Sequence, residues 1–187
     1  NLDDRVICFV GRLQSIKRLD VLVRALYLLK SEYNIMLKLL IIGDGDEKDN
    51  LQRLTDSLGL SDAVVYFGEC YDDEKILPLL SMSDILVSPG DVGLTAMHAL
   101  VSGIPVITHG DLNHQMPEAE AIEYGVNGCF FKRNNVDDLA NKIIECLEML
   151  STGRISPKTC RSTVESRYNP EYQLEVFSEI VLSICGI

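Results

Sequence analysis

The chain has 187 residues, 47% of them hydrophobic, and a formal net charge of −11 at pH 7. This hydrophobic fraction is enough for a packed core, and no apolar run reaches the roughly 18 residues that a membrane-spanning helix needs. The negative charge argues against nucleic acid and anionic membrane surfaces as partners.

Apolar runs alternate with amphipathic segments along the chain, which predicts strands alternating with helices. A strand over 6–10 precedes a helix over 19–33, and a nearly continuous apolar run over 36–42 predicts a strand covered on both faces. Further strands are expected at 63–67, 85–87, 105–108 and 128–131, and further helices at 47–58, 74–81, 93–102, 137–150, 156–168 and 170–184. This order predicts an α/β fold with a Rossmann-like, doubly wound parallel sheet and helices on both faces.

The same patterns divide the chain into two parts. Residues 1–150 are expected to form the Rossmann-like domain, and residues 151–187 to form a linker over 151–157 and two terminal helices. The first four residues lack the basic segment of a signal peptide, so we expect the chain to begin at a domain boundary. The six cysteines have no zinc or redox spacing, and we expect buried free thiols in a reducing cytosol.

Two cations follow the first predicted strand in this acidic chain. Gly11, Arg12 and Leu13 come directly after it, and Lys17 stands just before the next predicted helix. Ligands of open α/β sheets bind beyond the carboxyl ends of the strands, where cations beside a helix N-terminus suit a phosphate. The alternative is that Arg12 and Lys17 are ordinary solvated cations.

Four segments carry a family resemblance. They are Gly11-Arg12-Leu13 with Lys17; Leu40-Ile41-Ile42-Gly43-Asp44-Gly45; Val65-Tyr66-Phe67-Gly68; and Ser83-Asp84-Ile85-Leu86-Val87-Ser88-Pro89 leading to Gly103-Ile104-Pro105-Val106-Ile107. In this order and spacing they resemble the C-terminal half of retaining GT-B-fold glycosyltransferases, the glycosyl transferases group 1. Gly125-Val126-Asn127-Gly128 also fits, so the resemblance covers about residues 5–150.

The resemblance implies a hexosyltransferase of polysaccharide biosynthesis that moves a sugar from a nucleotide-diphosphate donor with retention at the anomeric carbon. This half of the fold binds the donor, and a preceding domain helps to bind a carbohydrate or lipid-linked acceptor. That domain would also receive the terminal helices. The resemblance further implies a cytoplasmic protein, held at the inner membrane face through the other domain if it meets the membrane at all.

The resemblance also assigns site residues. Arg12 and Lys17 would contact the diphosphate and act in catalysis. The donor-binding set would be Gly11, Gly68, Glu69, Gly90, Gly93, Leu94, Thr95 and His98. Gly93, Leu94 and Thr95 would offer backbone N–H groups at a helix start, which favours an anion. The alternative for Gly93 is a plain turn glycine.

The sequence departs from the family pattern at two positions. Gly90 and His98 stand where the family carries two glutamates, one near the donor sugar and one at the ribose. A neutral imidazole can accept one hydrogen bond and donate another, so His98 could replace the ribose-binding group. The alternatives are a nucleotide-sugar-binding module without turnover, a GT-B-fold epimerase, or a His98 that merely occupies helix surface.

A polar loop follows the fifth predicted strand. His109, Asp111, His114 and Glu118 lie in it, and a metal site there with His98 is conceivable, but the spacing matches no ligand motif. The alternative is a solvated connection. Gly43-Asp44-Gly45 lacks the third glycine of a dinucleotide fingerprint, so we expect no NAD site. We also expect no metal and no cofactor besides the donor.

Overall fold

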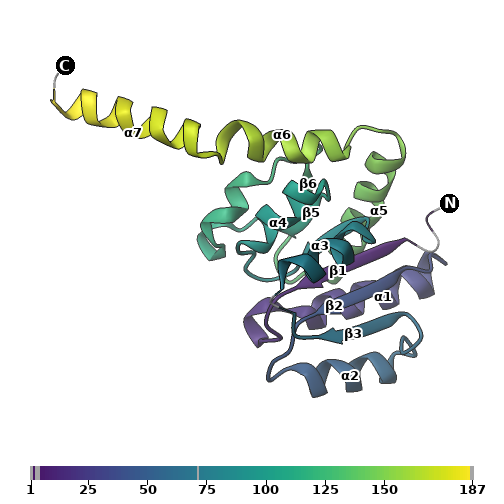
Figure 1. Ribbon diagram of the computed structural model, residues 1–187. Helices are drawn as coiled ribbons and strands as arrows, with labels where there is room; N and C mark the ends of the chain where they lie inside the picture. Colours follow the sequence, from purple (N-terminus) through teal and green to yellow (C-terminus); the bar gives the residue numbers. More distant parts are fainter. Residues whose placement is uncertain (1, 3–4, 71, 186–187) are drawn as a thin grey trace.

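A single parallel sheet organises the chain (Figure 1). The computed structural model describes residues 2, 5–70 and 72–185, so the expectation about the first residues falls largely outside them. Its strands are β1 (Val6–Val10), β2 (Lys38–Ile42), β3 (Val64–Gly68), β4 (Ile85–Ser88), β5 (Val106–His109) and β6 (Gly128–Phe131). They lie in the order β3-β2-β1-β4-β5-β6, and every pair is parallel.

Helices cover both faces of this sheet (Figure 1). One layer holds α1 (Leu19–Glu32), α2 (Lys48–Ser57) and α5 (Val136–Ser151), with α1 contacting the other two. The other layer holds α3 (Asp73–Ser81), α4 (Thr95–Ser102) and α6 (Pro157–Arg167), in which α4 contacts both neighbours. The doubly wound parallel fold predicted from the sequence is therefore confirmed.

The centre of the sheet is where the chain reverses its direction of winding. β1 pairs with β2 on one side and with β4 on the other, and Ile7, Cys8 and Phe9 are buried between the helix layers. In such a sheet a crevice opens beyond the carboxyl ends of the two strands at the reversal. The loops after β1 and β4 are consequently the first place to look for a ligand site.

The predicted strands and helices are present, with boundaries shifted by one or two residues. The shift that matters most is at α4, which begins at Thr95 and not at residue 93. Gly93 and Leu94 precede the helix, and Ala96 N–H donates to Gly93 O at 2.9 Å, in a tight opening turn. Three short 3₁₀ segments were not predicted: η1 (Ser15–Lys17), η2 (Leu112–His114) and η3 (Pro117–Ala121).

All six cysteines are free, as expected. Cys8, Cys129, Cys146 and Cys160 are buried, whereas Cys70 is half-buried and Cys185 is exposed. Burial raises the pKa of the Cys8 thiol to about 12, so this sulfur is an unreactive part of the core.

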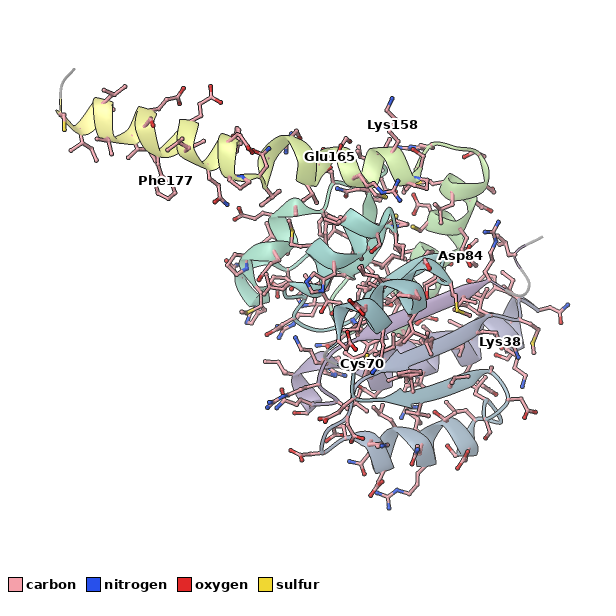
Figure 2. All side chains as sticks on the ribbon, in the orientation of Figure 1. Lys38, Cys70, Asp84, Lys158, Glu165 and Phe177 are labelled. Atoms are coloured by element: carbon pink, nitrogen blue, oxygen red, sulfur yellow. The ribbon has the colours of Figure 1, made fainter. Side chains whose placement is uncertain are left out.

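The last helix, α7 (Pro170–Cys185), extends away from the body of the molecule (Figure 1). None of its described side chains is buried, although Leu174, Phe177, Val181 and Ile184 recur at helical spacing along it. Figure 2 shows Phe177 standing clear of the sheet and its covering helices. Within the described residues, no helix combines the length and the apolar character that crossing a bilayer requires.

Candidate functional site

A hollow of about 260 Å³ opens at the carboxyl edge of the sheet. It lies where the loops after β1, β2 and β3 meet the start of α4, and Cys70, labelled in Figure 2, is on its wall. Its lining residues are Val10, Gly11, Arg12, Ile42, Gly43, Asp44, Glu69, Cys70, Ile76, Leu94, Thr95 and His98. Apolar walls with a few polar groups are typical of a small-molecule site.

Donor groups without internal partners belong to residues that line this hollow. The exposed side chain of Arg12 makes no hydrogen bond or ion pair with the described residues. Among the described residues, the N–H groups of Leu94 and Thr95 donate none of the backbone–backbone hydrogen bonds that lie outside the helices and strands. The Thr95 hydroxyl donates to Val10 O at 3.2 Å, which fixes the start of α4 beside the end of β1. A guanidinium next to a helix start favours an anion.

Lys17 lies beside the hollow and not in its lining. Its Nζ donates to Asp91 O at 2.6 Å, and its own carbonyl accepts from Gly90 N at 3.0 Å. Burial lowers the pKa of Lys17 from its ordinary value, and the carboxylates of Asp91 and Glu118 oppose that change. An ammonium has three donors, so Lys17 can brace this loop and still offer N–H groups to an anion.

Gly90 is glycine for a steric reason. A Cβ at this position would lie 1.9 Å from Ile16 O and 2.8 Å from the Lys17 backbone. No side chain, and so no glutamate, fits here unless the loop after β1 moves. The close contact between the loops that follow β1 and β4 thus explains why Gly90 departs from the family pattern.

His98 lies on the exposed side of α4, one turn beyond Leu94, and lines the hollow with it. Its N–H donates to Leu94 O at 3.2 Å. The structure therefore brings together Gly11, Arg12, Glu69, Leu94, Thr95 and His98. The other predicted residues, Lys17, Gly68, Gly90 and Gly93, do not line the hollow, but Gly68 and Gly93 each directly precede a residue that does.

The sequence prediction missed the contribution of the loop after β2. Ile42, Gly43 and Asp44 line the hollow, and Asp44 also accepts from Gly45 N at 2.8 Å and pairs with Lys48. The segment that contains them carries part of the family resemblance, but no role in the site was predicted for it. The signal that could have found them is strand order, because β2 adjoins β1 and their carboxyl ends share one edge.

The polar loop after β5 is folded and partly buried. His109 is 1% exposed, and neither ring nitrogen has a hydrogen-bond partner in the described structure. His114 Nδ1 lies 2.8 Å from the Asp111 carboxylate, which also faces Arg133 at 3.5 Å. Across the described residues no group of three or more histidine, cysteine or acidic side chains could hold a metal ion. The expectation of no metal and no cofactor stays a prediction.

A doubly wound parallel sheet with a hollow at its reversal point defines a Rossmann-like domain. The family described as Glycosyl transferases group 1 matches residues 1–159. The chain belongs to this family.

Curated relatives agree with this assignment. An uncharacterized glycosyltransferase from Methanocaldococcus jannaschii is 33% identical over 143 residues, which are 74% of this chain and 34% of the relative. A D-inositol 3-phosphate glycosyltransferase from Mycolicibacterium smegmatis is 30% identical over 156 residues, 78% of this chain and 33% of the relative. The chain thus spans about a third of the length of these two proteins.

Solved structures show the same fold. HepE from Anabaena in complex with UDP superimposes with a TM-score of 0.76 at 21% identity, over 99% of this chain and 50% of that one. TarM from Staphylococcus aureus, in a mutant complex that includes UDP, gives 0.78 at 22% identity, over 96% and 36%. The chain has the Rossmann-like fold of one half of a GT-B glycosyltransferase, as the sequence predicted.

Proposed function

We propose that this chain binds the nucleotide-diphosphate part of a sugar donor for a retaining hexosyltransferase. The observation that carries the proposal is that Arg12, whose side chain is unpaired among the described residues, lines the same hollow as Leu94 and Thr95 at the start of α4. Two solved structures of the same fold were determined with UDP, which supports a nucleoside diphosphate as the ligand class.

The chemistry follows from the charge that develops on the donor. When the glycosidic bond breaks, negative charge grows on the leaving diphosphate, and fixed donors stabilise it. Arg12 supplies a guanidinium, Lys17 an ammonium, and the loop before α4 supplies backbone N–H groups. Retention at the anomeric carbon is part of the proposal and follows from the family resemblance.

The proposal assigns the nucleoside to the remaining walls of the hollow. Glu69 and Cys70, after β3, would lie near the base, and His98 would face the ribose. The family assignment favours a transferase over an epimerase. A binding module without turnover is the other alternative, because neither family glutamate is present, and the retained Arg12 and Lys17 argue for the transferase.

The acceptor, carbohydrate or lipid-linked, would bind to another part of a longer protein. The apolar stripe of α7 (Leu174, Phe177, Val181 and Ile184) is exposed, which suits a helix that packs on a further domain. We propose that α7, the last part of residues 151–187, packs back in this way, and that such a protein works in the cytoplasm or at the inner face of a membrane.

The first test removes the unpaired cation. In Arg12→Ala, the affinity for a nucleoside diphosphate should fall by about tenfold to hundredfold, because one charge-assisted hydrogen-bonding group contributes about 1.5–3 kcal/mol. Calorimetry against UDP, GDP, ADP and CDP measures this and identifies the base. Arg53→Ala, on the exposed side of α2, is the matched control and should bind like the wild type. Equal affinity of Arg12→Ala and Arg53→Ala would refute the site.

A second test concerns the ribose. If His98 hydrogen-bonds a ribose hydroxyl, the wild type should prefer the diphosphate over its 2′-deoxy form by about fivefold, the weight of one ordinary hydrogen bond. His98→Ala should reduce that preference. A preference that survives the substitution would assign the ribose to another group and return His98 to the helix surface.

A further inference from the structure

The loop between β4 and α4 carries the N–H groups of the proposed anion site, yet it contains two glycines. Something must hold it in one shape if its donors are to converge on a ligand. From one side it is held by the loop after β1, through Gly90 N to Lys17 O at 3.0 Å and Lys17 Nζ to Asp91 O at 2.6 Å.

From the other side the loop is held by Gln115. Its Oε1 accepts from Val92 N at 2.9 Å, and Val92 is only 1% exposed. Its Nε2 donates to Thr108 Oγ1 at 2.7 Å and lies 3.2 Å from His109 O and 3.4 Å from Gly90 O. Thr108 Oγ1 donates in turn to Ser88 O at 2.9 Å. One amide therefore ties the β4–α4 loop to the end of β5.

The surroundings fix the orientation of this amide. Rotated by half a turn, the NH₂ group would face the Val92 N–H, and the amide oxygen would face the carbonyls of His109 and Gly90. Only the observed orientation satisfies both sides. Gln115 itself does not line the hollow, so it can influence a ligand only through the loop.

We propose that Gln115 is a positioning residue that sets the direction of the N–H groups of Gly93, Leu94 and Thr95 toward the diphosphate. This inference rests on the proposed function. Without the amide, the buried Val92 N–H loses its acceptor, and the loop is free to turn so that this group reaches water. Such a turn would move the three following N–H groups away from the anion. Contacts to the nucleoside, made by the loop after β3 and by His98 within α4, would be left in place.

The test is Gln115→Met, which keeps the length of the side chain and removes both hydrogen-bonding groups. Calorimetry with inorganic pyrophosphate, with the four nucleoside diphosphates and with the four nucleosides separates the two parts of the site. Pyrophosphate and diphosphate affinity should fall about tenfold, or about 1.4 kcal/mol, while nucleoside affinity stays within about twofold. Thr108→Val, which removes the hydroxyl that Gln115 reaches, should act in the same direction by about threefold.

The matched control is Asn127→Ser. Asn127 is a buried amide that likewise clamps a turn, with Oδ1 accepting from Glu123 N at 2.6 Å, but it precedes β6 at the opposite edge of the sheet. The Asn127→Ser substitution should lower the melting temperature and leave the affinities for pyrophosphate, nucleoside diphosphates and nucleosides unchanged. Equal diphosphate affinity in Gln115→Met and the wild type, or equal losses for nucleoside and diphosphate, would overturn the inference. A wild type that binds neither pyrophosphate nor any diphosphate would overturn the proposed function and this inference with it.

Discussion

The two ends of the strands, here called the amino edge and the carboxyl edge of the sheet, differ in whether their buried polar groups have hydrogen-bond partners. At the amino edge, Asp84 accepts from Arg5 at 2.6 Å and from Val6 N at 2.8 Å, and the Asn127 amide has partners for both its oxygen and its nitrogen. At the carboxyl edge, within the described structure, both ring nitrogens of His109 and Oε2 of Glu118 are buried without partners. In Figure 2, Asp84 and Cys70 mark the opposite ends of the strands.

This difference separates polar groups that stabilise the fold from polar groups that lie at the same edge as the proposed donor site. A buried polar atom without a partner costs about 1–3 kcal/mol. A chain that leaves such atoms at one edge and satisfies them at the other is less stable than it could be, and the loss falls at the edge of the proposed donor site. The amino edge should therefore respond to substitution with stability, and the carboxyl edge with binding.

The largest effect is expected at the amino edge. Asn127→Ala removes hydrogen bonds to Glu123 N, Ala121 O and Thr163 Oγ1 and leaves these groups unpaired in a fully buried place. The free energy of unfolding should fall by about 2–4 kcal/mol. Urea unfolding measures this, and calorimetry should find nucleotide affinity unchanged. A loss below about 0.5 kcal/mol would mean that the two edges do not differ in this way.

A smaller effect is expected from pH at the carboxyl edge. Burial lowers the pKa of His109 below its ordinary value of 6.5, and the nearby Arg133 acts in the same direction, while Asp111 and Asp91 oppose it. As the pH falls, the His109 imidazole therefore takes up a proton in the unfolded chain before it does so in the folded chain. Stability should be constant above the ordinary pKa and fall by up to about 1.4 kcal/mol between pH 7.5 and 5.5.

Urea unfolding at a series of pH values measures this dependence. His109→Phe, whose ring can keep the edge contact with Phe131, removes the titrating group and should flatten that part of the profile. Asn127→Ala carries no change in titratable groups and should lower the whole curve without altering its slope. A His109→Phe profile as steep as that of the wild type would assign the pH dependence to other residues.

The fold could be predicted because its signals are local. Runs such as Val6–Val10 and residues 39–42 are apolar on both faces. The side-chain cap of α5 is Asn135, just before the helix predicted over 137–150. The three 3₁₀ segments were missed because three to five residues are too short to show a period. The start of α4 was misplaced because the chain before it is held by other loops and not by helical hydrogen bonds.

The site was predictable only in part. Arg12, Thr95 and His98 were found because a motif of known order surrounds them, and they line one hollow. Gln115 looks like any polar loop residue, and its partner Val92 is 23 residues away in the chain. The burial of His109 was missed because β5 continues one residue beyond the strand predicted over 105–108. Contacts between distant loops leave no trace in local patterns.

The central place of β1 also determines how long one side of this strand stays unpaired during synthesis. Arg5, at its start, pairs with Asp84, 79 residues later, so the partner strand β4 does not exist when β1 is made. At translation rates of about 5–20 residues per second, one edge of β1 stays open for about 4–16 s. Unpaired strand edges invite pairing with other chains. The nascent chain is therefore most exposed to aggregation before β4 appears, and the proposed diphosphate site, which needs the loops after β1 and β4, cannot form sooner.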